Sequence, residues 1–333
     1  MLVGTEDTAY ANKSQQQLRY YFVYDQLKSA PRAVTVLLSG KPGFRFVAEE
    51  PLWYFRHAFP GMNFIHRIPV SSEGRRHPLP PVLPIRAGVG ISACYRAARV
   101  GGDFYDFVEV NETRVLFILL DIAGKKEETL NIAAAAQAIL RERGQELLGH
   151  EDVNVADALT DLLLEINRTI LAAADGVRCA PAFLGCYDWE FGLLHYCNAG
   201  HTPGFVRDES GVMLLESNGL PLGLFSHATH DAQLCALSPG AALVLVSKGL
   251  VEARSGRHEF GVDGVRQVLR NSTSTDANKL CSELLEAVEK FERAPTHFGP
   301  QLHVPGFRNN HEPNDYTVLA LMRAYSEVMA AAD

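Results

Sequence analysis

The sequence lacks any long hydrophobic run: no stretch reaches the roughly 18 uninterrupted apolar residues that a membrane-spanning helix needs. The N-terminal segment MLVGTEDTAYANKSQQQ also lacks the basic start and apolar centre of a signal peptide. Basic residues are in the minority, with 31 Lys and Arg against 39 Asp and Glu and a formal net charge of -8. An acidic chain is a poor match for a nucleic-acid backbone or an anionic membrane surface. We therefore expect a cytoplasmic protein that binds neither nucleic acid nor membrane.

Sulfur and imidazole motifs are missing as well. None of the six cysteines forms a CxxC pair, and most lie inside apolar runs, which favours a reducing compartment. The 12 histidines show no ligand spacing such as HExxH, so a zinc site is not expected. No internal repeat is present. The length of 333 residues suits one domain of about 200 to 250 residues with an appendage.

Prolines mark a domain boundary in the first quarter of the chain. Residues 71–84 read SSEGRRHPLPPVLP, and the four prolines prevent regular hydrogen bonding across this stretch. We predict an N-terminal region of unknown fold at 1–70, a linker at 71–84, a main domain at 85–325 and a tail at 326–333. Within the N-terminal region, the patterns indicate an amphipathic helix over 14–29 and a strand over 33–38.

The main domain shows strand groups separated by paired helices. Apolar runs predict strands, and residues three and four apart predict helices. The expected strands are 91–97, 104–110, 114–121, 181–187, 193–197, 241–247 and 316–322; the expected helices are 127–148, 153–174, 262–270 and 275–291. Short hairpins and helices gathered in pairs favour an α+β sandwich of antiparallel sheets over a doubly wound parallel sheet.

Two aspartates stand out in this pattern. Asp121 follows the apolar run at 116–120, where a carboxylate must be well hydrogen-bonded or bound to a cation. Asp103 lies one hairpin earlier, in the motif VGGDFYDF, and two such carboxylates can build an acidic metal site on a sheet. The alternative for Asp103 is a turn residue that caps its own backbone. Asp106 of the same motif is interpreted as a hydrogen-bonding residue at a strand end.

Seven motifs then occur in a familiar order: VGGDFYDF at 100–107, LDIAGK at 120–125, NAGHTP at 198–203, LPLGLF at 220–225, SKGLVEAR at 247–254, EFG at 259–261 and NDYTVLAL at 314–321. From about Leu83 to Arg323 the chain resembles the SpoIIE/RsbU branch of the PPM-type protein serine/threonine phosphatases. The resemblance implies an αββα sandwich of two antiparallel sheets flanked by helix pairs. It also implies two divalent cations, Mn²⁺ or Mg²⁺, that activate a water for attack on phosphoserine.

The resemblance assigns ligand roles residue by residue. Asp103 matches an acid on one cation, Asp121 matches the acid that bridges both, and the carbonyl of Ile122 completes the first cation's protein shell. Lys248 falls where the family has the aspartate of its TDG motif, and Asn314 falls on the first aspartate of the closing acidic pair.

These two replacements imply one cation at most. An ammonium has no lone pair to offer while protonated, and it repels a divalent ion by several kcal/mol at an effective dielectric near 20. We expect Lys248 to occupy the second cation's position and to pair with Asp121. Asn314 offers a neutral oxygen, and a rescue by Asp315 is second best because its side chain should point to the opposite face of a strand.

Three functions stay open on the sequence. The first is a phosphatase of weak activity on a phosphoserine-bearing regulatory protein, which in this family is often an anti-anti-sigma factor. The second is a pseudophosphatase that regulates by binding a partner, with one cation or none. The third assigns the function to the N-terminal 80 residues. His201 in NAGH is interpreted as structural, and the loop 297–313 as a lid, a partner surface or a tolerated insertion.

Overall fold

The computed structural model describes residues 20–25, 33–38, 41–47, 77–96, 102–124, 126–174, 178–294 and 315–325. The chain divides into two compact units, Met1–Gly74 and Arg75–Asp333. Asn314, the loop 297–313 and the tail 326–333 lie outside the described residues.

The first unit contains a three-stranded antiparallel sheet of β1 (Tyr20–Asp25), β2 (Ala33–Leu38) and β3 (Lys41–Val47), in that order. The strand expected over 33–38 is confirmed. The helix expected over 14–29 is wrong, because its described part, β1, pairs along its whole length with β2. The run YYFVY within β1 consists of aromatic and β-branched residues, which favour strands, and this preference outweighs the helical spacing of the apolar positions.

The second unit is built on two five-stranded antiparallel sheets. One has the order β10-β9-β12-β15-β4 and the other the order β11-β8-β7-β6-β5. A short hairpin, β13 and β14, stands apart from both. The strands are β4 (Val89–Arg96), β5 (Asp103–Glu109), β6 (Arg114–Asp121), β7 (Ala182–Asp188), β8 (Leu193–Ala199), β9 (Gly204–Asp208), β10 (Gly211–Leu215), β11 (Gln233–Ala236), β12 (Ala242–Val246), β13 (Arg254–Ser255), β14 (His258–Glu259) and β15 (Tyr316–Arg323).

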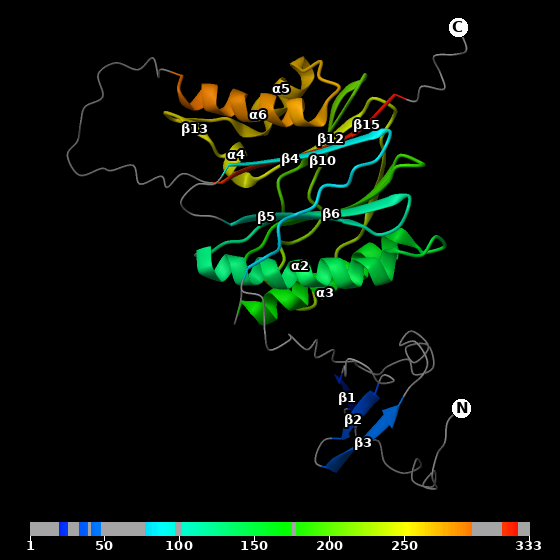
Figure 1. Ribbon diagram of the computed structural model, residues 1–333. Helices are drawn as coiled ribbons and strands as arrows, with labels where there is room; N and C mark the ends of the chain where they lie inside the picture. The colour runs from blue at the N-terminus through cyan, green and yellow to red at the C-terminus, as the bar shows by residue number, and fades with distance from the viewer. Residues whose placement is uncertain are drawn as a thin grey trace, which may run out of the picture. The chain divides into compact units, whose positions relative to one another are not determined.

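Helices cover the outer face of each sheet (Figure 1). The helices are α2 (Lys126–Leu148), α3 (Val155–Ala173), α4 (Lys248–Val251), α5 (Gly261–Asn271) and α6 (Ala277–Glu292). The long pair α2 and α3 lies on the sheet that contains β5 and β6, while α5 and α6 lie on the sheet that contains β12 and β15. The predicted α+β sandwich with four layers is therefore confirmed. None of the helices in the described residues combines the length and hydrophobicity that crossing a bilayer requires.

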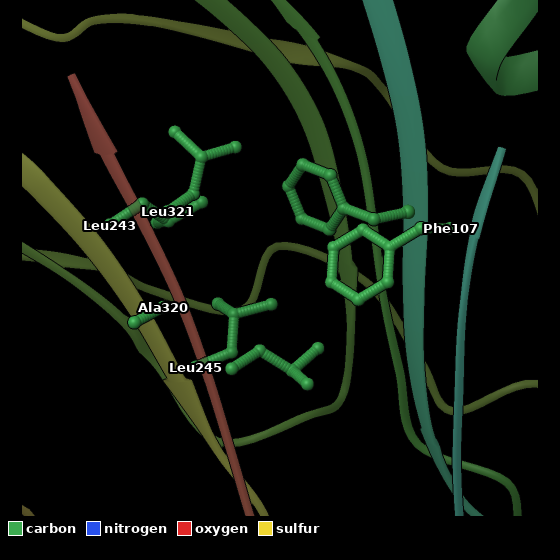
Figure 2. A pocket seen from close by; sticks show the side chains of 7 residues that line it. Phe107, Leu243, Leu245, Ala320 and Leu321 are labelled. Atoms are coloured by element: carbon green, nitrogen blue, oxygen red, sulfur yellow. The ribbon is translucent and has the colours of Figure 1, made fainter. Parts of the chain in front are cut away.

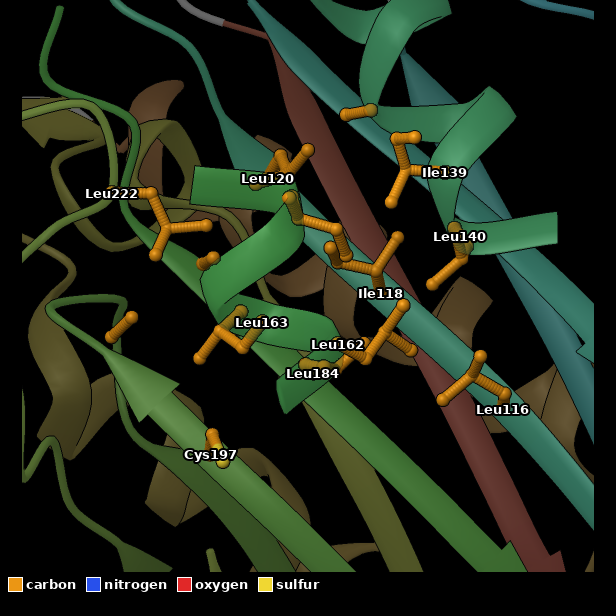
Figure 3. Packing of buried hydrophobic residues seen from close by; sticks show 14 of the residues in the cluster. Leu116, Ile118, Leu120, Ile139, Leu140, Leu162, Leu163, Leu184, Cys197 and Leu222 are labelled. Atoms are coloured by element: carbon orange, nitrogen blue, oxygen red, sulfur yellow. The ribbon is translucent and has the colours of Figure 1, made fainter. Parts of the chain in front are cut away.

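The central strand β6 explains why its sequence is apolar without alternation. Leu116, Ile118 and Leu120 face α2 and α3 in the core that Figure 3 shows. The residues between them face the other sheet. A strand that is buried on both faces reads as a continuous hydrophobic run, so the sequence identifies it easily.

The space between the two sheets is closely filled. Figure 2 shows Phe107 directed toward Leu243, Leu245 and Leu321 of the opposite sheet, around a void of about 10 Å³. Such packing fixes the two sheets against each other. Because the sheets are antiparallel and tightly stacked, the first residue of β5, the last residue of β6, the end of β12 and the start of β15 are held in place near one another.

Part of the predicted linker is attached to the sandwich. The backbone N–H of Leu79 donates to Oε1 of Gln137 on α2 at 2.7 Å, and Nε2 of Gln137 donates to the carbonyl of Leu79 at 2.8 Å. One amide side chain thus satisfies both polar groups of a residue in an extended, proline-rich segment, as a neighbouring strand would.

Candidate metal centre

Asp103 and Asp121 form the base of the candidate site. Asp103 is the first residue of β5, Asp121 is the last residue of β6, and the two are direct partners in the antiparallel register. Directly opposed residues on neighbouring strands project from the same face of a sheet. The fold therefore brings together the two acids that the sequence singled out.

The backbone around these acids is fixed by close approach. The N–H of Ile122 donates to the carbonyl of Gly102 at 2.9 Å, and the N–H of Asp121 donates to the carbonyl of Pro181 at 2.9 Å. A Cβ at position 102 would lie 2.8 Å from the carbonyl oxygen of Ile122, so only glycine fits there. The Ile122 side chain is buried in the α2 and α3 core, which leaves its main chain to face the acids.

A cleft of about 190 Å³ opens above this base. It lies between the ends of the two sheets and combines carboxylates, one ammonium and exposed backbone. Its lining residues are Gly102, Asp103, Asp121, Ile122, Ala123, Gly124, Lys248, Gly249, Glu252 and Asp315.

Asp315 takes a place in this cleft that the sequence interpretation gave only second rank. The Tyr95 hydroxyl donates to Oδ2 of Asp315 at 2.8 Å, and the N–H of Gly102 donates to the same oxygen at 3.2 Å. The expectation that its side chain points away is wrong, because Asp315 precedes β15 and the alternation of a strand does not apply to it.

Two hydroxyl residues hold Asp103, and the sequence interpretation missed both. The Thr317 hydroxyl donates to Oδ2 of Asp103 at 2.6 Å. Ser247 Oγ in turn accepts from the N–H of Thr317 at 3.1 Å and donates to the carbonyl of Asp315 at 3.2 Å. Both residues lie within the motifs SKGLVEAR and NDYTVLAL, next to Lys248 and two residues after Asp315 respectively.

Lys248 begins the one-turn helix α4 and lines the cleft, but its partner is not the one expected. Its Nζ lies 3.4 Å from Oε1 of Glu252, and the two side chains are 59% and 43% exposed. No ion pair between Lys248 and Asp121 occurs among the described residues, so that expected pair is wrong. Glu252 is four residues further along the same helical turn, the spacing at which opposite charges meet. The ammonium still acts on Asp121 electrostatically, lowering its pKa against larger opposing effects.

Burial controls the ionisation of both acids. Burial raises the pKa of Asp103 to about 7, an effect that the hydrogen bonds from Thr317 and Ser247 oppose and the nearby Asp121 and Asp315 reinforce. Burial also raises the pKa of Asp121, which Lys248 lowers and other carboxylates raise. Carboxylates that resist ionisation in the folded chain gain from a cation that stabilises their charge.

The raised pKa of Asp103 predicts a pH-dependent stability without metal. The folded chain holds this proton more tightly than the unfolded chain, in which the carboxyl has a pKa of 3.8. The stability that the protonated carboxyl contributes is therefore complete below about pH 4 and is lost as the pH rises through about 7. In a chelating buffer, we expect the free energy of unfolding to fall by about 2 kcal/mol more between pH 5 and pH 7.5 in the unmodified protein than in Asp103→Asn. Urea denaturation at each pH measures the free energy of unfolding. If this free energy changed with pH equally in the two proteins, the raised pKa of Asp103 would be contradicted.

Two other candidate residues have structural roles, although Asp106 lies within β5 rather than at a strand end. Asp106 is fully buried and receives two hydrogen bonds from Arg141, at 2.7 and 2.9 Å, away from the cleft. His201 is buried beside Thr202, and burial lowers its pKa to about 4, which keeps the ring neutral.

The cleft offers oxygen donors of the kind that a hard cation takes. The four carboxylates and one ammonium of the cleft carry a formal charge of -3 when all are ionised. No group of three or more His, Cys, Asp or Glu side chains in the described part of the chain is arranged to hold a metal ion. Two opposed carboxylates and a backbone oxygen, with water in the remaining positions, are nevertheless a shell that Mg²⁺ accepts.

Comparison with known proteins places this arrangement in a family. The family model described as "Stage II sporulation protein E (SpoIIE)" matches residues 111–298, more than half of the chain. The chain belongs to the SpoIIE family. Within the PPM phosphatases to which this SpoIIE/RsbU-like group belongs, Mn²⁺ or Mg²⁺ is the general cofactor.

Two known proteins resemble the chain at a distance. Protein IcfG of Synechocystis is 25% identical over 64% of this chain and 36% of its own length. The phosphoserine phosphatase RsbP of Bacillus subtilis is 24% identical over 52% of this chain and 42% of its own. The chain thus spans less than half the length of these relatives. The PP2C phosphatase domain structure of Bacillus subtilis SpoIIE aligns with a TM-score of 0.54 and 17% identity over 70% of this chain and 63% of that one, which supports the fold.

Proposed function

We propose that this chain is a PPM-type protein serine phosphatase of weak activity whose site holds at most one Mn²⁺ or Mg²⁺ ion. The observation that carries the proposal is the opposed pair Asp103 and Asp121 at the base of a cleft that Lys248 also lines. By family resemblance, this lysine stands where the family has a further metal-binding aspartate. The fold and the family support a phosphatase, and the lysine supports the limit on metal content.

Asp103, Asp121 and the carbonyl of Ile122 would hold the cation, and Asn314 is the further candidate by family resemblance. When bound, a divalent cation lowers the pKa of a coordinated water and offsets phosphoryl charge. Thr317 fixes the carboxylate of Asp103 by a hydrogen bond, Ser247 in turn accepts from the N–H of Thr317, and Gly102 keeps the backbone close. These residues set ligand geometry without themselves reacting.

The substrate we propose is a phosphoserine on a small regulatory protein of the anti-anti-sigma type, in the cytoplasm. The name of RsbP identifies that relative as a phosphoserine phosphatase, which supports the residue type. The net charge of -8 speaks against nucleic acid and anionic membranes as partners.

A second candidate function is a pseudophosphatase that binds a phosphoprotein or another partner without turnover. The specific observation in its favour is Lys248, which lies in the cleft with its charge only partly met by Glu252, 3.4 Å away in a solvated pair. An ammonium at this position can contact a phosphate group but cannot ligate a metal.

Metal titration and turnover distinguish the two functions. We expect calorimetry to find no more than one Mn²⁺ per chain and hydrolysis of an aryl phosphate or a phosphoserine peptide that is slow but dependent on metal. Asp121→Asn should lose both metal binding and roughly 100-fold in turnover, because it removes the central ligand. Asp263→Asn, the same change at a side chain that is 94% exposed, is the matched control and should change neither.

Each possible result supports one of the two functions and contradicts the other. Phosphopeptide binding without any turnover above the Asp121→Asn background would select the pseudophosphatase. Two bound Mn²⁺ ions with fast turnover in the unmodified chain would overturn the limit to one ion.

A further inference from the structure

Two cysteines lie on the helix-covered side of the β12 and β15 sheet, away from the inter-sheet core. Cys94 lies on the edge strand β4 and is partly exposed, and Cys281 lies on α6 and is buried. Both belong to the hydrophobic cluster between this sheet and its helices. Neither has a part in the proposed phosphatase site.

Close packing brings α6 onto β4 at this place. Gly90, four residues before Cys94 and on the same face of β4, has no side chain, and a Cβ there would lie 3.6 Å from Cβ of Ala277 on α6. A Cβ at this distance would be in ordinary van der Waals contact, so α6 lies against β4 at normal packing distance. Cys281 lies one turn of α6 after Ala277, and Cys94 lies four residues after Gly90 on β4.

Shared neighbours locate the two sulfur atoms. The Sγ of Cys281 lies 3.9 Å from the carbonyl oxygen of Ser92 and 3.8 Å from that of Val318, the residue directly opposite Cys94 in the sheet. The Sγ of Cys94 lies 3.9 Å from Oδ1 of Asn278, which also accepts from the Ser92 hydroxyl at 3.4 Å. Cys281 thus reaches the backbone that flanks Cys94 on both sides.

We propose that Cys94 and Cys281 are an oxidisable dithiol that forms a disulfide between β4 and α6 when the protein meets a peroxide. The thiolate of Cys94 attacks one peroxide oxygen; an S–O bond forms, the O–O bond breaks, and the departing oxygen leaves as water after taking a proton. The Cys281 sulfur then attacks the sulfenic sulfur, an S–S bond forms, the S–O bond breaks, and the departing hydroxide takes the Cys281 thiol proton to leave as a second water. Two thiols are oxidised and one peroxide is reduced.

The chemistry of the pair assigns the two roles. Hydrogen bonding from the Cys281 thiol lowers the pKa of Cys94, against the opposing effect of burial, while this bond and burial raise the pKa of Cys281. The thiol that ionises more readily is also the one that solvent reaches, so Cys94 attacks first and Cys281 resolves. The cross-link would restrain β4 next to Tyr95, whose hydroxyl holds Asp315 in the cleft.

The test uses the full chain, reduced and then treated with about one equivalent of hydrogen peroxide, followed by alkylation, digestion without reductant and mass spectrometry. We expect a linked Cys94 and Cys281 peptide, about 2 Da lighter than its reduced parts, in most chains and reversed by dithiothreitol. Cys281→Ala should yield no link and a Cys94 sulfenic acid that dimedone traps. Cys197→Ala, a buried cysteine in the other core, is the matched control and should form the link normally.

Folding of each variant is checked by circular dichroism, and Cys94→Ser provides a second variant from the more exposed side of the pair. The proposal is overturned if the folded, unmodified chain forms no such link. It is also overturned if the link forms no faster in the folded chain than in urea, because geometry would then contribute nothing.

Discussion

Substituting Lys248 by aspartate is expected to raise the affinity of the cleft for Mn²⁺ by at least about tenfold and to increase turnover with it. The change removes an ammonium and adds a carboxylate in a cleft that already contains Asp103, Asp121, Glu252 and Asp315. The formal charge of these five positions would pass from -3 to -5. In a dry site, removing the repulsion between the ammonium and the cation would raise the metal affinity by far more than tenfold. Lys248 is 59% exposed, so solvent screens part of this repulsion.

Two further variants separate repulsion from ligation. Lys248→Met removes the charge without adding a ligand, so it should gain part of the affinity and no second metal equivalent. Lys248→Asp combined with Asn314→Asp should bind two Mn²⁺ ions per chain and show the highest turnover. Lys279→Asp on α6 makes the same charge change at an exposed lysine outside the cleft, and should leave affinity unchanged.

Calorimetric titration with Mn²⁺ and turnover of an aryl phosphate provide the readouts. A Lys248→Asp protein that binds no more metal than the unmodified chain would show that the lysine is not what limits the site. Gains equal to those of Lys279→Asp would attribute the effect to net charge alone.

The pairing of the two strands that hold Asp103 and Asp121 could be predicted from the sequence, because the burial of β6 makes its ends recognisable. β6 is apolar at every position between Val115 and Leu120, so its end is unambiguous. The hairpin to β5 then places Asp103 opposite Asp121 by register alone. Strong local patterns and one short connection determine this part of the site.

The positions of the other cleft residues depend on where β15 begins and on contacts between segments that are far apart in the sequence. Asp315 points into the cleft because it precedes β15 and its carboxylate is held by the Tyr95 hydroxyl and the N–H of Gly102, contacts that a local pattern does not report. Thr317 and Ser247 meet Asp103 only because two sheets stack, which local patterns do not report. Glu252 could have been found, since four residues from Lys248 is one helical turn.

Substituting Arg141 by methionine is expected to lower the free energy of unfolding by about 3 kcal/mol. Asp106 is fully buried on the helix-facing side of β5, and Arg141 of α2 meets it with two hydrogen bonds, at 2.7 Å from Nε and 2.9 Å from Nη2. Removing the guanidinium leaves a carboxylate among apolar side chains with no cation beside it. A buried charge without its partner costs far more than the intact pair contributes.

The double variant Arg141→Met with Asp106→Leu should recover most of the lost stability, because it replaces the whole pair by apolar groups of similar size. Arg168→Met, an exposed arginine of α3, is the matched control and should change stability by no more than about 0.5 kcal/mol. Urea denaturation measures all three. If the double variant were as unstable as Arg141→Met, the loss would come from other contacts, such as that of Arg141 Nη2 to the carbonyl of Pro80 at 3.4 Å. Recovery would instead show that the loss in Arg141→Met comes from the unpaired carboxylate of Asp106, and that an apolar contact at this position stabilises the fold as well as the ion pair does.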